Sequence, residues 1–579
     1  MHSMKKLAPW LVLLACVAAC PGSGSRTGPT GPETGPTSLT GPVTLSIVGT
    51  NDVHGAIDRL PVFAGFLANL RQRRADDGGV VLIDAGDMFQ GTLESNMNEG
   101  EAVIDAYNQI GYNAVVVGNH EFDFGPVGPA VSPSEPSDDP RGALLARMAQ
   151  ARFPVLAANY LDASTGRRVD WPNAPATTSF TVAGVQVGVI GVSTLHTLEA
   201  TLAANVSDLK MAPLADTITR EARALRERGA QVVLVTAHAG GKCKNFDDPN
   251  DLSSCDSKEE IMQVAAALPS GLVDVIVAGH THRAVAHRVN GIAIIESYSS
   301  MRAFGRVDLR VTPNGEQPAS VEIAKIHRPR DICPGDRRLP VSKCQPGEYE
   351  GAPVVADQRV AGVIEPALEA AAARKQESLG VEIVGTFRRS YDTESALGNL
   401  LTDLTRTTRG TDVAVTNGGG LRADLPAGAL TYGRLYELTP FDNRFATIEM
   451  TAADLSAALA TNLQRDHGIF LVSGVRADAR CVNNALIVDL LDERGVPIPP
   501  DRRLVITTSD YLATAESSPL ARTGAGGPTI RIENDGTMRD AIAQVLRKRG
   551  GQIRADDPAL TTPRLRYVGK RPVQCAAVQ

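Results

Sequence analysis

The sequence predicts an α/β protein with two domains, and three observations support this prediction. Six short apolar runs, rich in Val and Ile and bounded by polar turns, recur in the N-terminal half. Such runs are typical of strands buried on both faces of a layered α/β fold. Five of the six runs lead directly into residues that commonly bind metals. Finally, the chain has 579 residues, more than one hydrophobic core usually supports.

The predicted strands and the residues after them read, in order, VTLSIVGTNDVHG, VVLIDAGD, AVVVGNHEFD, GVQVGVIGVS, VVLVTAHAGG and VDVIVAGHTH. Only GVQVGVIGVS lacks a candidate ligand. In a layered α/β fold the carboxyl ends of such strands open into one crevice, which gathers residues that are distant in sequence. We therefore expect one site that contains Asp52, His54, Asp87, Asn119, His120, His238, His280 and His282.

These side chains have the chemistry of a centre with two metal ions. Asp52 and His54 are alternate residues of an extended segment, so they point to the same side. The carboxylate of Asp87 can bridge two cations about 3.5 to 4 Å apart. The Asn119 carbonyl and the three later histidines suit zinc, manganese, cobalt or similar ions. The pattern predicts a phosphoester hydrolase that uses two divalent metal ions.

The composition is that of a globular protein, with 43% hydrophobic and 21% charged residues. The net charge of −7 argues against a surface that coats nucleic acid. We therefore expect a small-molecule substrate and no nucleic-acid polymer as partner. The sequence leaves the oligomeric state open.

The N-terminus predicts export and lipid anchoring. Lys5 and Lys6 precede an apolar run from Leu7 to Ala19, which is too short to span a bilayer comfortably. The residues VAAC that end at Cys20 resemble a bacterial lipobox, in which the cysteine carries the lipid. We expect a signal peptide over residues 1–19 and attachment to the cell envelope, in the periplasm or at the cell surface. An ordinary cleaved signal is the alternative.

Six cysteines follow Cys20, an even number that suits disulfides in an oxidising compartment. The short spacings suggest that Cys243 pairs with Cys255 and Cys333 with Cys344, which leaves Cys481 and Cys575 to pair by elimination. Spacing alone leaves the other connectivities open. No CxxC motif is present, so a structural zinc site is not expected.

After the predicted signal peptide, composition divides the chain into four segments. Residues 20–42 are rich in Gly, Pro and Thr and predict an extended tether. Residues 43–327 alternate strands with helical stretches and form the first expected domain. Residues 328–353 gather Pro, Gly, charge and two cysteines and are the expected connector. Residues 354–575 form the second expected domain.

The ordered motifs NDVHG, GD, GNHEFD, H and GHTH resemble the calcineurin-like metallophosphoesterases, and within them the 5′-nucleotidase and UDP-sugar hydrolase family. The resemblance covers nearly all of the chain after the tether. It implies a four-layered α/β/β/α metallophosphoesterase domain followed by a smaller α/β substrate-binding domain. It assigns one metal to Asp52, His54, Asp87 and His282, and the other to Asp87, Asn119, His238 and His280.

The resemblance also implies catalytic roles for two residues that bind no metal. His120 would face the phosphate, stabilise the transition state and protonate the leaving oxygen. Asp123, three residues later, would orient His120 and favour its protonated form.

The second domain carries GNLLTD, NGGGLR, TPFDN and SGVR, which resemble the substrate-binding domain of the same family. The resemblance implies that Phe441 and Tyr511 stack on the base and that Asn417 contacts base or ribose. Gly419 would permit close backbone approach, and Arg422 would bind phosphate together with Arg389 or its neighbour Arg388. The GGDG segment that usually contacts ribose is absent, so ribose recognition has no assigned residue.

These features predict hydrolysis of extracellular nucleotides, chiefly nucleoside 5′-monophosphates, to nucleoside and phosphate. The enzymatic alternatives are a 2′,3′-cyclic nucleotide phosphodiesterase and a hydrolase of UDP-sugars or nucleoside diphosphates. The non-enzymatic alternative is a surface lipoprotein that binds nucleotides without turnover.

Overall fold

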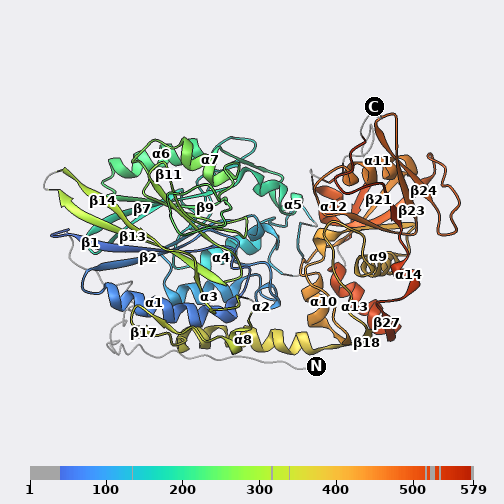
Figure 1. The fold of residues 1–579 in the computed structure, drawn as a ribbon, viewed down its shortest axis with the longest axis horizontal. Helices are drawn as coiled ribbons and strands as arrows, with labels where there is room; N and C mark the ends of the chain where they lie inside the picture. Colours follow the sequence, from blue (N-terminus) through green and yellow to red (C-terminus); the bar gives the residue numbers. More distant parts are fainter. Residues whose placement is uncertain are drawn as a thin grey trace, which may run out of the picture.

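The computed structural model describes residues 39–575, except residues 129, 134, 315–316, 338, 516–517, 522–528 and 534–535. The predicted signal peptide, Cys20 and most of the predicted tether lie outside the described residues. The described chain forms two lobes that stand side by side (Figure 1). Among the helices of these residues, none is both long enough and apolar enough to cross a membrane.

The first lobe is built on two β-sheets. The first sheet has the strand order β14-β13-β1-β2-β3-β4, with β15 paired to β13. Its strands are β1 (Val43–Thr50), β2 (Gly78–Asp84), β3 (Ala114–Val116), β4 (Val155–Leu156), β13 (Ala303–Asn314), β14 (Gln317–Ile326) and β15 (Arg330–Asp331). The second sheet has the order β11-β12-β10-β9-β7-β6. Its strands are β6 (Thr177–Val182), β7 (Val185–Ser193), β9 (Val232–His238), β10 (Val275–Ala278), β11 (Ala284–Val289) and β12 (Ile292–Ser297).

Alternation along the strands explains how these sheets stack. Leu45 and Ile47 of β1 lie in a core cluster with Leu234 of β9, so this core fills the space between the sheets. Val48 points the other way, into a core formed with helices. The second sheet alternates likewise, because Val233 belongs to a separate outer core. Both sheets are thus covered on two faces.

Helices complete the outer layers. The first sheet is covered by α1 (Leu60–Arg74), α3 (Glu101–Ile110) and α4 (Gly142–Gln150). The second sheet is covered by α6 (Leu214–Glu227) and α7 (Glu260–Ala267). This arrangement confirms the predicted four-layered α/β/β/α domain. The lobe also contains the short helices α2 (Leu93–Asn96) and α5 (Ala203–Val206) and a small sheet of β5 (Tyr160–Asp162) and β8 (Leu209–Met211).

The strands that precede the candidate ligands come from both sheets. In the first sheet β1, β2 and β3 are parallel, and in the second β9 and β10 are parallel. Pairing of β1 with β2 places Thr50 opposite Asp84 at the carboxyl end of both strands. The loops that carry the ligands therefore leave corresponding edges of two stacked sheets.

The second lobe contains three smaller sheets around one core. The strands are β18 (Ser378–Val384), β20 (Gly428–Thr431) and β27 (Gly551–Arg554); β19 (Val413–Asn417), β21 (Phe445–Thr451), β22 (Phe470–Ser473), β25 (Arg503–Ser509) and β26 (Thr529–Ile532); and β23 (Arg476–Val482), β24 (Ala485–Leu491) and β28 (Leu565–Arg566). The helices are α9 (Ala396–Arg409), α10 (Tyr432–Leu438), α11 (Ala452–Leu463), α12 (Asp510–Thr514), α13 (Met538–Arg549) and α14 (Pro558–Thr561). The lobe is α/β, as predicted.

Helix α8 (Gln358–Gln376) belongs to both lobes and runs along the base of the molecule (Figure 1). It begins at Asp357, whose side chain accepts hydrogen bonds from the backbone N–H groups of Arg359 and Val360. Val360 and Ile364 are buried in the helical core of the first lobe. Near its other end, Ala371 is buried in the core of the second lobe. This one helix joins the two cores.

The segment before α8 forms two short strands, β16 (Glu348–Tyr349) and β17 (Ala352–Pro353). It also contains the Cys333–Cys344 disulfide. The other two disulfides join Cys243 to Cys255 and Cys481 to Cys575. All three predicted pairs are confirmed.

Candidate active site

Most of the predicted ligands have an unusual backbone. Asp52 and His54 both have φ 49°, and Asp87, His280 and His282 have φ 56°, 79° and 56°. Residues other than glycine rarely adopt this left-handed region, because Cβ crowds the backbone. Such conformations persist where the surrounding structure holds them, and they gather at functional sites. The backbone therefore marks this cluster independently of its side chains.

Hydrogen bonds continue from the ends of β1 and β2 into the two ligand loops. The Asp52 N–H donates to the Gly86 carbonyl at 3.0 Å, and the His54 N–H donates to the Asp87 carbonyl at 2.9 Å. Buried Asp84 supports the second loop by accepting from the Gly86 N–H at 2.9 Å. These bonds align Asp52 and His54 with Asp87.

The side chains of the ligand loops form two groups that share Asp87. One group contains Asp52, His54, Asp87 and His282, and the other contains Asp87, His238 and His280. Within each group, every member offers a nitrogen or oxygen atom within 4.8 Å of the others. The Asn119 Oδ1 atom joins the second group, 2.9 Å from His238 Nε2 and 3.0 Å from His280 Nδ1. The structure thus brings together all seven predicted ligands.

The tautomers and spacings of the histidines suit divalent metal ions. Nδ1 of His54 lies 2.6 Å from the Gln90 carbonyl, and Nδ1 of His238 lies 2.8 Å from the Ala85 carbonyl. Donation to these carbonyls leaves each Nε2 lone pair facing the cluster. His54 Nε2 lies 2.9 Å from His282 Nε2. Neighbouring ligands of one ion bound at about 2.0 to 2.1 Å would be spaced about 3 Å apart, so the donor set fits divalent metals.

Electrostatics also favour metal binding. Burial and the neighbouring His282 lower the pKa of His54 to about 3, and burial and His238 lower the pKa of His280 to about 4. Both imidazoles are therefore neutral, as ligands must be. His238 differs: burial opposes its charged form, but the attraction of Asp87 raises its pKa to about 10, so its ring must release a proton when a metal binds. Burial would raise the pKa of Asp87, but the attraction of the His238 and His120 rings holds it well below its usual range. Asp87 is therefore a carboxylate.

His120 and Asp123 form a pair beside the cluster. His120 opens a 3₁₀ turn, His120–Phe122, and its Nδ1 lies 2.5 Å from Asp123 Oδ2. Its backbone N–H donates to Asp87 Oδ1 at 2.9 Å, and its ring centroid lies 5.2 Å from that of His54. Burial opposes the charged imidazole, but Asp123 and Asp87 attract it and raise its pKa to about 9. The pair is placed to hold a proton next to the metal ligands.

Glu121 is a buried residue of this site that the sequence reasoning did not identify. Its carboxylate accepts from the backbone N–H groups of Gly118 (2.6 Å), Asp87 (2.9 Å) and Met88 (2.6 Å). These bonds fix the loop that presents Asp87. The sequence held one signal for it: in GNHEFD this charged residue stands directly between His120 and an apolar residue. A carboxylate buried at that place needs several hydrogen-bond donors, which the ligand loop supplies.

In the second lobe, Asn417 and Phe441 line a cavity of about 60 Å³. The guanidinium of Arg422 lies over the Phe441 ring, 5.6 Å from its centroid. Arg539 holds the loop that carries Phe441, since it donates to the carbonyls of Thr439 at 3.1 Å and Phe441 at 3.0 Å. Sequence reasoning did not identify Arg539, which follows Phe441 by 98 residues.

The two arginines after Phe387 have different surroundings. Arg388 is 80% exposed and pairs with Asp424 at 2.8 Å. Arg389 donates to the Leu421 carbonyl at 3.4 Å. Burial lowers the pKa of Arg422, and the positive charge of Arg389 lowers it further. Arg389 is therefore the arginine on the side of Arg422.

Gly419 and Tyr511 lie beside an aromatic residue that sequence reasoning missed, Tyr391. A Cβ on Gly419 would lie 3.4 Å from Tyr391 Cε2, and Tyr391 is 46% exposed. Tyr511 is the second residue of α12, whose N-cap is Ser509, and it is half-buried. Burial raises the pKa of its phenol, with smaller contributions from Tyr391 and from Asp123 of the first lobe. Tyr511 is not among the described residues that line the cavity of Asn417 and Phe441.

The Phe441 loop touches the first lobe next to the ligand loops. Gln90, whose carbonyl contacts His54, donates through its side chain to the Pro440 carbonyl at 3.3 Å. Asn96 donates to Asp442 at 3.3 Å, also between the lobes. The candidate substrate surface therefore borders the metal-ligand cluster.

Comparison with known proteins adds two domain assignments. Residues 45–284 match the calcineurin-like phosphoesterase family, and residues 372–520 match the 5′-nucleotidase, C-terminal domain family. The chain is 26% identical over 495 residues to endonuclease YhcR of Bacillus subtilis (strain 168), covering 82% of this chain and 37% of YhcR. It thus spans little more than a third of that protein. It is 24% identical over 509 residues to protein UshA of Yersinia enterocolitica serotype O:8, covering 81% of this chain and 85% of UshA.

Among solved structures, the 5′-nucleotidase precursor from Thermus thermophilus has the same fold. It superposes with a TM-score of 0.62 at 22% sequence identity, and the match covers 89% of this chain and 100% of the other.

Proposed function

Since the chain belongs to the 5′-nucleotidase family of metallophosphoesterases, we propose that it hydrolyses nucleotides, chiefly nucleoside 5′-monophosphates, to nucleoside and phosphate. We assign two divalent ions, such as Zn²⁺, Mn²⁺ or Co²⁺, to the seven clustered ligands. The observation that carries the proposal is that Asp87 belongs to both donor groups while His120 lies directly beside it. This geometry suits attack on a phosphorus atom held between two cations.

When bound, the metals would neutralise charge on the phosphoryl oxygens and would lower the pKa of a bound water molecule toward neutrality. The chain itself supplies the proton. His120, held by Asp123 at 2.5 Å, is placed to donate from Nε2 to the oxygen of the leaving nucleoside. A proton on this oxygen avoids formation of an alkoxide, so departure of the nucleoside becomes easier.

The second lobe would bind the nucleoside. Phe441 offers a ring for stacking, which accepts purines and pyrimidines alike. Arg422 and Arg389 offer guanidinium groups for the phosphate, and Asn417 offers an amide for base or ribose. Tyr511 is assigned as the second stacking residue.

Tyr391 joins this group because its exposed ring lies beside Gly419 and because it acts on both neighbours: it opposes the lowering of the Arg422 pKa and helps to raise the pKa of Tyr511. Its ring could contact the sugar, and its hydroxyl can donate to an oxygen of the substrate. The segment that corresponds to the missing GGDG residues, at 522–528, lies outside the described residues.

A substrate panel tests the proposal. Phosphate release would be measured from AMP, UMP, ADP, UDP-glucose and 2′,3′-cyclic AMP, with Mn²⁺, Zn²⁺, Co²⁺ or Mg²⁺ added, beside a His120→Ala control. We expect the monophosphates to give the highest kcat/KM and the control to lose most activity. Turnover of cyclic or diphosphate substrates without turnover of AMP would replace this function by the corresponding alternative. Nucleotide binding without any release would favour the non-enzymatic one.

We also propose that the protein is exported and attached to the envelope through Cys20. The three disulfides support an oxidising compartment. Radiolabelled palmitate should be incorporated into the full chain and lost in Cys20→Ala. Equal labelling of both proteins would contradict the anchor.

A further inference from the structure

Strand β12 carries no predicted metal ligand, yet it ends among the ligand loops. Its neighbour β10 leads into His280 and His282, and β9, the next strand of the sheet, ends at His238. Glu296, the second-to-last residue of β12, is 1% exposed. The catalytic mechanism proposed above does not use this buried carboxyl group.

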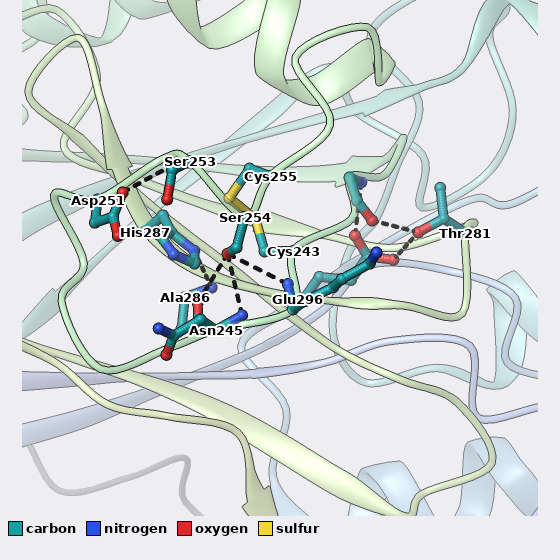
Figure 2. Close-up of a disulfide and its surroundings, with 12 residues drawn as sticks. Cys243, Asn245, Asp251, Ser253, Ser254, Cys255, Thr281, Ala286, His287 and Glu296 are labelled. Carbon is teal, nitrogen blue, oxygen red and sulfur yellow. Dashed lines mark hydrogen bonds between the residues drawn. A yellow bond between two sulfur atoms is a disulfide. The ribbon is translucent and has the colours of Figure 1, made fainter.

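Glu296 contacts both neighbouring loops. Its Oε2 accepts from the Gly241 N–H at 2.8 Å, three residues after His238. Its Oε1 accepts from the Thr281 hydroxyl at 2.6 Å, and Thr281 stands between His280 and His282. Figure 2 shows Glu296 beside Thr281. One side chain therefore holds the loop of His238 and the loop of the other two histidines.

The two loops are packed closely against each other. A Cβ on Gly240 would lie 2.3 Å from the Gly279 carbonyl oxygen and 2.6 Å from Thr281 Cγ2. Thr281 and Gly241 are also in direct contact, since the Gly241 carbonyl lies 2.8 Å from the Thr281 hydroxyl. The first of these loops continues into Cys243, which forms a disulfide with Cys255 (Figure 2).

The following residue of β12 supports a third loop. The Ser297 N–H donates to Asn51 Oδ1 at 2.9 Å, and Asn51 Nδ2 donates to Asp52 Oδ2 at 2.7 Å. The end of β12 thus contacts three of the five loops that supply ligands, without supplying a ligand itself.

We propose that Glu296 is a positioning residue that sets metal affinity by fixing His238 relative to His280 and His282. It acts through Gly241 and Thr281 and touches neither metal nor substrate. Partners that orient metal ligands commonly change metal affinity about 10- to 100-fold when they are removed. The inference rests on the metal site of the proposed function, but it concerns affinity and not the identity of the substrate.

The test measures the binding of Mn²⁺ alone, by competition with a fluorescent chelator and without any nucleotide. We expect Glu296→Ala to weaken Mn²⁺ binding about 10- to 100-fold, and Glu296→Gln, which keeps one acceptor oxygen, to weaken it less. The matched control is Asp308→Asn. Asp308 is also a buried carboxylate of the first lobe, but it pairs with Arg306 at 2.8 Å and with Ser46. Ser46 lies before the carboxyl end of β1, so Asp308 does not contact the ligand loops through it. The control should lose stability and keep the wild-type affinity for Mn²⁺.

Thr281→Val provides a second variant with nearly the same shape as the original residue. If Glu296 acts through Thr281, this change also weakens Mn²⁺ binding, and combining it with Glu296→Gln adds less than the sum of the two single effects. Wild-type affinity in a folded Glu296→Ala protein, or full additivity of the pair, would overturn the inference. If Glu296→Ala does not fold, unchanged affinity in Thr281→Val overturns it alone. Failure of the wild-type protein to bind Mn²⁺ would instead count against the metal site itself.

Discussion

Replacing Asp123 with Ala tests how His120 is held. The His120 Nδ1 and Asp123 Oδ2 atoms lie 2.5 Å apart, and the side chains are 23% and 17% exposed, so water screens their contact only in part. A hydrogen bond to a charged group contributes about 1.5 to 3 kcal/mol. Because about 1.36 kcal/mol changes a rate tenfold, we expect kcat to fall about 10- to 150-fold. His120→Ala removes the acid itself and should cost more, about 10² to 10⁴.

The assay is steady-state phosphate release at saturating AMP and saturating metal, with bound metal measured in parallel. The His120→Ala/Asp123→Ala double variant should match His120→Ala, because Asp123 acts through His120. Asp308→Ala is the matched control, since Asp308 contacts His327 at 2.8 Å in the same lobe. A kcat for Asp123→Ala equal to that of the wild type would refute the reasoning. So would a double variant that is slower than His120→Ala by the full Asp123 factor.

Three further predictions concern the substrate, the metals and the disulfides. Arg422→Ala should lower kcat/KM for AMP about 10- to 100-fold through loss of a charged contact, and Arg422→Lys should restore it only in part; unchanged kinetics would remove Arg422 from the site. Dialysis against a strong chelator should abolish phosphate release and lower the melting temperature, and Mn²⁺ should reverse both effects; activity that survives verified metal removal would contradict the metal centre. Replacing Cys481 and Cys575 with Ser opens a loop with a sequence separation of 94, and in the chain-entropy model this should lower the free energy of unfolding of the second lobe by about 4 to 5 kcal/mol. Opening the Cys243–Cys255 loop, with a separation of 12, should cost about 3 kcal/mol. If urea unfolding gave the reverse order, this account would be contradicted.

Local sequence was sufficient for several features of this protein. Strand ends could be placed because runs such as VVLIDAGD change from apolar to polar at one residue, and the resulting ligands all gather in the structure. The short spacings of four cysteines suggested the two local pairs that the structure forms. The family resemblance linked His120 to Asp123, and the structure places Nδ1 and Oδ2 of the pair 2.5 Å apart across a single turn.

Other features depend on partners that the sequence does not mark. The sequence did not reveal that Glu121 and Glu296 support the ligand loops, because most of their partners are backbone N–H groups, which every residue except proline possesses. Arg388 and Arg389 could not be told apart until the structure placed Asp424 beside the first and Arg422 near the second. Tyr391 carries no local signal that brings it to Gly419.

By itself, the sequence determined which side chains could bind metal and that each follows a buried strand, because burial pattern and residue type are local properties. Only the tertiary structure decided that β1, β2 and β3 belong to one sheet and β9 and β10 to another. It also decided that Gln90 contacts both His54 and the loop of Phe441. Strand pairing, sheet stacking and contacts between lobes join residues hundreds of positions apart. Their free energy comes from the shared burial of surfaces, which no local pattern specifies.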